Sequence, residues 1–197
     1  MKLRKLLLMF SLMVVVGVPL IANAATAIAT VGPNNSAPNI FYNGNCNGVF
    51  NLMTNNAFIR SKVGFGFNPN VNVQFAPMVG LCATYQINAA GIWHLGLADP
   101  MGIPTTFSVT DNAGNTLLKG EFRGAILHGR SGSSSLALTL PADNVVYDVA
   151  SSPFLAPGIA PDGGSLSIAI LSQNPVMANA NGPQGFQANG DINFGMQ

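Results

Sequence analysis

Glycine, proline and asparagine interrupt this chain at short intervals, and that spacing limits what the chain can fold into. Beyond residue 24, Gly or Pro occurs in almost every stretch of ten residues. No window shows a sustained i, i+3, i+4, i+7 apolar pattern, which an amphipathic helix requires. Short runs rich in β-branched and aromatic residues lie between the interruptions instead. We therefore expect an all-β fold.

The expected strands lie between turn sequences such as NGNCNG, DNAG, PADN and PDGG. They are predicted at residues 40–43, 48–53, 57–67, 71–75, 78–87, 91–97, 105–110, 116–128, 134–140, 144–149, 165–172 and 185–195. The strands of residues 105–149 follow one another closely and predict an antiparallel meander. We expect an antiparallel, jelly-roll-like β-sandwich in one domain over residues 40–197. Its last strand alternates less regularly and is a candidate edge strand.

The N-terminus has the pattern of a secretory signal peptide. Lys2, Arg4 and Lys5 precede an apolar stretch, and Ala22-Asn23-Ala24 provides small residues for cleavage. Residues 1–24 are therefore expected to be removed, which predicts a secreted protein located outside the cell, on its surface or in the periplasm. Residues 25–39 are expected to form a flexible segment, mobile or docked along an edge of the sandwich.

The charge of the predicted mature chain argues against a nucleic acid as partner, and its apolar pattern argues against a membrane span. Five Lys and Arg residues remain after residue 24, against seven Asp and Glu residues, whereas nucleic-acid binding needs a basic face. The mature chain contains no second long apolar run, so we expect no membrane span in it. Charged residues are only 8% of the sequence, and so little charge leaves weak repulsion between copies of the molecule.

Cys46 and Cys82 are the only two cysteines. In an exported protein an even pair predicts a disulfide bond. A metal or redox site is the alternative, but the pair lacks CxxC spacing and nearby histidines.

The sequence LKGEFRGAILHGRSGSSS, at 118–135, carries the highest density of chemically active side chains. On a single strand, Lys119, Glu121 and Arg123 would face solvent, while Leu118, Phe122 and Ile126 would face the core. Glu121 and His128 would then lie far apart on opposite faces. The serine run lacks the G-x-S-x-G pattern of a nucleophile elbow. We therefore interpret this stretch as a hairpin strand with its turn, and predict no catalytic residues.

Metal ions and cofactors are not predicted. His94 and His128 have no partner at ligand spacing. Asp111, Asn112 and Asn115 in one turn, and Asp162 in another, offer oxygen ligands for calcium, but neither turn matches the EF-hand loop.

A glycosidase would need two facing acids. Antiparallel pairing of the strands could bring Glu121 and Asp148 onto one sheet, but nothing in the sequence selects that register.

One part of the chain resembles a known family. Residues 107–151 are similar to a module of bacterial exported PEP-CTERM-type surface proteins. The matching residues are Asp111, Gly114, Leu117, Leu118, Gly120, Phe122, Gly129 and Tyr147. The resemblance implies a non-catalytic β-sandwich of the cell surface or extracellular matrix, and it implies no site residues. The chain ends in DINFGMQ, without the Pro-Glu-Pro sorting tail of that family.

The leading functional hypothesis is a secreted, non-catalytic structural or adhesive protein. Its more specific form is a filament subunit in which residues 25–31, with Ala25, Ile28 and Val31, add a strand to a neighbouring copy. The alternative is a secreted carbohydrate-binding module that uses Trp93, Tyr85 or Tyr147 to stack on an extracellular polysaccharide. For Trp93 itself, a position in the core with His94 facing solvent is the competing interpretation.

Overall fold

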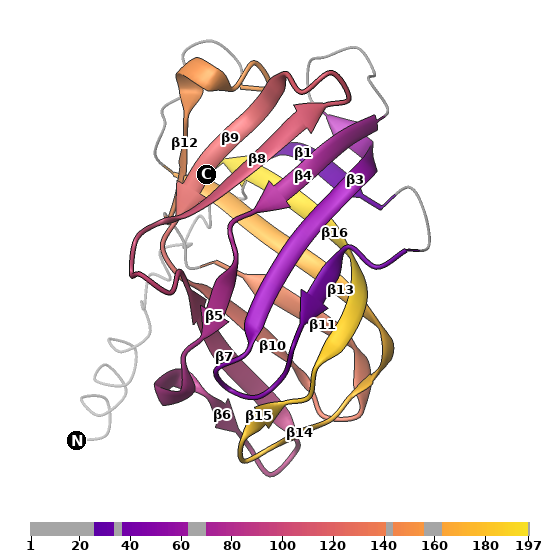
Figure 1. The fold of residues 1–197 in the computed structure, drawn as a ribbon, viewed down its shortest axis with the longest axis vertical. Coiled ribbons are helices and arrows are strands. Elements are labelled where there is room, and N and C mark those ends of the chain that lie inside the picture. Colours follow the sequence, from indigo (N-terminus) through magenta and orange to yellow (C-terminus); the bar gives the residue numbers. More distant parts are fainter. Residues whose placement is uncertain (1–25, 34–36, 63–69, 141–143, 156–162, 197) are drawn as a thin grey trace, which may run out of the picture.

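Two layers of antiparallel β-strands pack face to face (Figure 1). The computed structural model describes residues 26–33, 37–62, 70–140, 144–155 and 163–196. The predicted signal peptide and Ala25 lie outside these ranges. Within them the only helical elements are two short 3-10 turns, η1 (Cys82–Thr84) and η2 (Val149–Ser151). No helix in this part of the chain is long and apolar enough to cross a membrane.

Each layer contains four or five long strands, and further strands connect the two layers at their edges. The first layer contains β3 (Val49–Lys62), β4 (Asn70–Phe75), β8 (Thr105–Asp111) and β9 (Thr116–Phe122). The second layer contains β7 (Ile92–Ala98), β10 (Ala125–Arg130), β11 (Ser133–Thr139), β13 (Gly164–Val176) and β16 (Phe186–Met196). The predicted all-β sandwich is confirmed.

Shared strands close both sides of the sandwich. On one side β1 (Thr26–Gly32) and β2 (Ile40–Tyr42) each pair with both β3 and β16. On the other side β5 (Met78–Gly80) pairs with β3 and β7, and β12 (Val145–Tyr147) pairs with β9 and β13. Three small strands lie at the periphery: β6 (Gln86–Ile87), β14 (Ala178–Asn179) and β15 (Gly182–Pro183).

Strict alternation along the strands builds the core between the layers. In β4, Val71, Val73 and Phe75 are buried while the residues between them are not. Phe107 lies at the centre of an aromatic cluster, with ring centroids 5.6 Å from Phe75 and 5.4 Å from Phe194. Aromatic pairs at such distances add to the free energy gained by burying their surface.

The predicted single strand at residues 116–128 is wrong. Gly124 has a φ of +70°, and there the chain leaves β9 in the first layer and begins β10 in the second. Lys119, Glu121 and Arg123 face solvent and Leu118 and Phe122 are buried, as predicted. The break changes the alternation, however, so Ile126 is 39% exposed rather than in the core. For the same reason residues 105–149 cross between layers and do not form one meander.

Two terminal segments also differ from the predictions. The final strand, β16, is not an edge strand, because it pairs with β13 on one side and with β1 and β2 on the other. Residues 26–32, expected in a flexible segment, form β1, which pairs with β16 from Thr26↔Met196 to Val31↔Ile192. The sandwich therefore begins at β1 rather than at residue 40. The reason is that small and apolar side chains fit the space between β3 and β16.

Replacing Gly124 tests the layer crossing. A Cβ at Gly124 would meet only Leu97 O, at 3.7 Å, so the cost of Gly124→Ala arises from the left-handed backbone. We expect the free energy of unfolding to fall by about 1 kcal/mol, measured by urea denaturation. Gly124→Asn should cost less, because Asn tolerates positive φ better. Equal stability of the Ala variant and the wild type would contradict this account.

Candidate functional site

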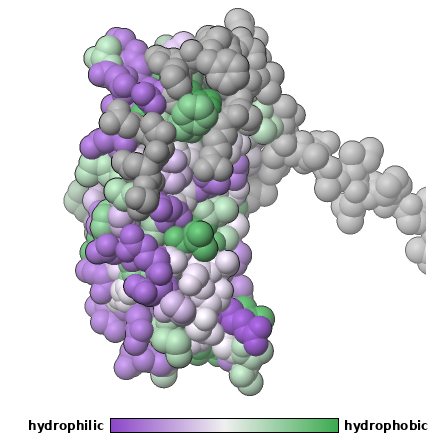
Figure 2. All heavy atoms as spheres, turned by 90° about the vertical axis from the view of Figure 1, so that its right-hand side faces the viewer, coloured by the Kyte–Doolittle hydropathy of each residue, from purple (hydrophilic) through white to green (hydrophobic). Residues whose placement is uncertain are grey.

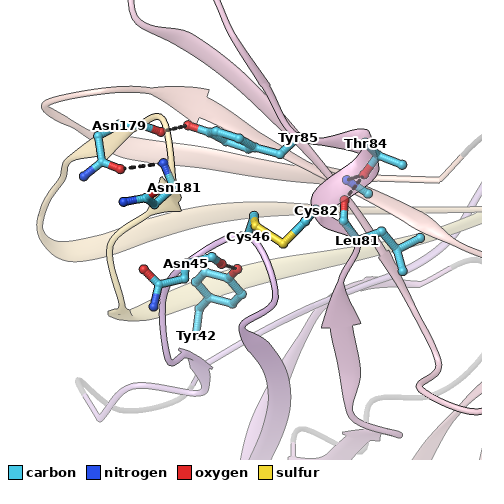
Figure 3. The surroundings of a disulfide bond; sticks show 10 residues. Tyr42, Asn45, Cys46, Leu81, Cys82, Thr84, Tyr85, Asn179 and Asn181 are labelled. Carbon is cyan, nitrogen blue, oxygen red and sulfur yellow. Dashed lines mark hydrogen bonds between the residues drawn. A yellow bond between two sulfur atoms is a disulfide. The ribbon is translucent and has the colours of Figure 1, made fainter.

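A disulfide bond joins Cys46, in the loop after β2, to Cys82 in η1, with Cα atoms 4.7 Å apart (Figure 3). This pairing confirms the prediction from the cysteine count. The bond closes a loop between residues 36 positions apart, which in the chain-entropy model stabilises the fold by about 4 kcal/mol. It thereby holds the β2–β3 loop against the start of the second layer.

Hydrogen bonds extend this anchor to a third segment, the β14–β15 hairpin (Figure 3). The amide of Cys46 donates to Asn181 O at 2.7 Å, and the Tyr85 hydroxyl donates to Asn179 O at 2.7 Å. Gly182 lies so close to the loop that a Cβ there would be 2.3 Å from Cys46 N. Only glycine permits this approach, so the disulfide end brings three distant parts of the chain into close contact.

A groove opens next to this end, where β13 and β16 separate. The two strands pair from Gly164↔Met196 to Ser172↔Ala188, and no further pair follows in the described residues. The groove between them has a volume of about 610 Å³. Its walls come from β2, β3, β13, β16 and the loop residues next to β2 and β16, and consist of Phe41, Tyr42, Asn43, Val49, Asn51, Ser172, Gln173, Asn174, Pro175, Val176, Gly185, Phe186 and Gln187.

The groove has a distinctive chemistry. Its described lining contains no charged residue, whereas five side chains carry amides: Asn43, Asn51, Gln173, Asn174 and Gln187. Phe41 is 41% exposed at this lining. Figure 2 shows the side of the molecule where β13 and β16 run, with mostly hydrophilic residues and small separate hydrophobic patches. Neutral donors and acceptors beside an aromatic ring suit a polar, uncharged ligand.

The aromatic residues predicted to stack on a sugar lie elsewhere. Trp93 is 0% exposed and Tyr147 is 1% exposed, so neither ring offers a face to a ligand. Trp93 is a core residue, and a Cβ at Gly129 would lie 2.9 Å from its Cζ2 atom. The Tyr147 hydroxyl, which has one proton to donate, lies 3.0 Å from Gly195 O and 3.2 Å from Ser165 O. Tyr85 is half-buried and belongs to the disulfide end.

Of the residues proposed for assembly, Ile28 and Val31 lie within the sandwich, and Ala25 lies outside the described residues. Ile28, Ala29 and Val31 of β1 are buried at 8%, 1% and 1% exposure. Thr30 donates a hydrogen bond from Oγ1 to Asn193 Oδ1 at 2.9 Å. In this structure β1 therefore completes the sheet of its own chain.

The two histidines, which showed no ligand spacing in the sequence, lie next to each other. His94 on β7 pairs directly with His128 on β10, and their ring centroids are 5.9 Å apart. Burial, together with the charge of His94, lowers the pKa of His128. Sequence reasoning missed the pair because the signal lies in the β7–β10 register, which local spacing does not reveal.

The acidic pair considered for glycoside hydrolysis is not assembled. β12 does pair with β9, but Glu121 lies opposite Val146. Asp148 instead lies beside Lys119, with Oδ2 4.0 Å from Nζ. Its hydrogen bond with Ser151 and the neighbouring Lys119 lower its pKa. Asp148 also caps η2 by accepting from Ser151 N at 3.2 Å, which is a structural role.

The serine run and the acidic turn also have local structural roles. Ser133 Oγ accepts from Ser135 N at 3.0 Å. Asp111 accepts from Asn115 Nδ2 at 2.8 Å and from Ala113 N at 2.9 Å, and these bonds lower its pKa, that from Asn115 most strongly. Asp162 lies outside the described residues. Within the described ranges, no group of three or more His, Cys, Asp or Glu residues is placed to hold a metal ion.

Comparison with protein-family models, with curated proteins and with solved structures found no match to this chain.

The tyrosines make stability sensitive to alkaline pH. Burial raises the pKa of all three tyrosines, that of Tyr42 to about 12 from 10.0. The unfolded chain therefore loses its phenolic protons first, and the contribution of Tyr42 to stability is lost as pH rises from 10 to 12. We expect phenolate absorbance to rise together with unfolding over this range. Tyr42→Phe should lose less stability between pH 9 and 12 than the wild type, and an identical loss would contradict the assignment.

Proposed function

We propose that this chain is an exported, non-catalytic structural or adhesive protein that self-assembles by exchange of β1 between copies. The observation that carries the proposal is the position of β1. It is the first described strand, it pairs on both sides, and it buries Ile28, Ala29 and Val31 between β3 and β16. A terminal strand in such a position can be replaced by the same strand of a second copy with every contact preserved.

The strand edges that β1 covers, on β3 and β16, support exchange for a second reason. If β1 leaves, the backbone edges of β3 and β16 are exposed over the region it covered, and such edges readily bind another strand. The register of β1 also shifts between Ala27 and Ala29 on β16, and between Thr30 and Val31 on β3. Each shift disrupts the backbone ladder locally, so β1 has fewer regular ladder positions than an uninterrupted strand of the same length. The low charge of the chain adds little repulsion between copies.

Export is part of the same proposal. The signal-peptide pattern of residues 1–24 supports it, and so does the disulfide, because such bonds persist in oxidising compartments. After removal of that peptide, β1 would follow directly on the new N-terminus. A strand so close to a free end can leave its sheet without unthreading the remainder of the chain.

A cysteine pair can trap β1 in either arrangement. Thr30 pairs with Asn193, and their side chains already form a hydrogen bond. We expect Thr30→Cys with Asn193→Cys, oxidised at protein concentrations approaching about 1 mM, to give covalent multimers on a non-reducing gel. High concentration is needed because a short linker gives the intramolecular strand an effective concentration of about that value.

The control uses the other neighbour of the same residue. Asn193 also pairs with Ser167 on β13, so Ser167→Cys with Asn193→Cys should form only intramolecular bonds at every concentration. Exchange is supported if the Thr30/Asn193 cysteine pair gives multimers and the Ser167/Asn193 pair does not. The self-assembly proposal would be overturned if both pairs gave only cross-linked monomer at all concentrations.

The groove favours a second candidate function, the binding of a neutral polysaccharide. Sugar hydroxyls need both donors and acceptors, which the five amides supply, and Phe41 provides an exposed ring for an apolar sugar face. Phe41 and the groove amides take the sugar-binding role that was predicted from the sequence for Trp93 and Tyr147. The groove and β1 involve different surfaces, so the two functions are compatible.

Affinity electrophoresis in gels containing dextran, starch or another neutral polysaccharide tests the groove. We expect one such gel to retard the wild-type protein, and Phe41→Ala and Gln187→Ala to migrate faster in it. Ile126→Ala is the matched control, because Ile126 is exposed to nearly the same extent, at 39%, on the outside of the second layer. Absence of retardation in every gel, or equal effects of the Phe41 and Ile126 variants, would contradict sugar binding by the groove.

A further inference from the structure

The histidine pair on the outer face of the second layer has a geometry that the proposed functions do not use. His94 and His128 occupy directly opposite positions on β7 and β10. Their rings are close to parallel, at an interplanar angle of 25°. The two strands pair over six consecutive positions, from Ala125↔Leu97 to Arg130↔Ile92. The Cα positions of the two histidines are therefore set by a continuous ladder rather than by a loop.

The residues opposite the two histidines on the neighbouring strands do not form an ion-pair network with them. Gln86 on β6 lies opposite His94, and Ala137 on β11 lies opposite His128. Neither carries a charge. The nearest cationic position in the ladder is Arg130, two residues along β10 from His128 and opposite Ile92. Two imidazoles are thus placed side by side without a carboxylate opposite either of them.

Both rings are also available to a ligand from solvent. His94 is exposed and His128 is half-buried. A neutral imidazole has a free lone pair on one ring nitrogen, which can bind a metal ion. Neutral imidazole is a good ligand for zinc, copper and nickel, whereas magnesium and calcium prefer oxygen.

We propose that His94 and His128 together bind one divalent transition-metal ion, with water molecules completing its coordination. Opposite side chains on antiparallel strands have Cβ atoms about 4.5–5.5 Å apart, and metal–imidazole bonds are about 2.0–2.1 Å long. Rotation about the side-chain bonds can therefore bring one nitrogen of each ring to a shared ion without moving the strands. Cu²⁺ should bind most tightly, because it stands highest in the order of affinities for such ligands. This inference is independent of β1 exchange and of sugar binding.

The test is a Cu²⁺ titration of the tag-free mature protein in a buffer that does not chelate copper. His94 and His128 are the only histidines of the chain, so the histidine region of a proton NMR spectrum reports on this site alone. We expect substoichiometric Cu²⁺ to broaden both histidine signals together. Calorimetry should give one site, and His94→Ala or His128→Ala should each weaken its affinity at least tenfold.

Two controls show whether a loss of affinity is specific to the two histidines. Gln86→Ala changes the neighbour of His94 and should leave the affinity within about twofold. Far-UV circular dichroism confirms that each variant is folded. A single-histidine variant that binds Cu²⁺ as tightly as the wild type would overturn the proposal. So would broadening of one histidine signal at Cu²⁺ levels that leave the other unchanged.

Discussion

Closure of the sandwich on both sides by shared strands is the constraint on which the other features depend. Unpaired strand edges are exposed backbone that tends to bind other chains. Here β1 and β2 join β3 to β16 on one side, while β5 and β12 join the layers on the other. Because β1 closes one side by pairing with both β3 and β16, the stability of that side is tied to the strand that we propose to exchange between copies. The groove arises next to the same side, where β13 and β16 stop pairing.

Much of the architecture can be predicted from the sequence because local patterns determine it. The strands predicted at 71–75 and 165–172 lie within β4 (Asn70–Phe75) and β13 (Gly164–Val176), and the turn glycines and asparagines placed most strand ends. Cys46 and Cys82 could be paired because no other cysteine competes. Strand alternation also placed Trp93 and His94 on opposite faces. The burial of Trp93 shows that it is a core residue rather than a residue that stacks on a sugar.

The remaining features depend on contacts between distant residues, which local patterns do not reveal. Gly124 was interpreted as a residue within a strand that a bulge could bend, because a glycine in a strand pattern does not show by itself that the chain crosses between layers. The groove amides come from β3, β13, β16 and the loop after β2, so two parts of the chain that are far apart in the sequence build the groove. The pairing of His94 with His128 likewise depends on which strand lies beside β7. Residues 26–32 contain suitable side chains for a strand, but only β3 and β16 together create the space that they fill.

The pairing of Thr26 with Met196 has a consequence for how the molecule can be attached to anything else. These residues place the first and last described parts of the chain side by side at one end of the sandwich. The β14–β15 hairpin lies toward the other end of the long axis (Figure 1), and the disulfide lies beside this hairpin (Figure 3). A tether or fusion partner joined at either end of the folded chain would therefore hold the sandwich by the same end. In both cases the disulfide end would project away from the point of attachment.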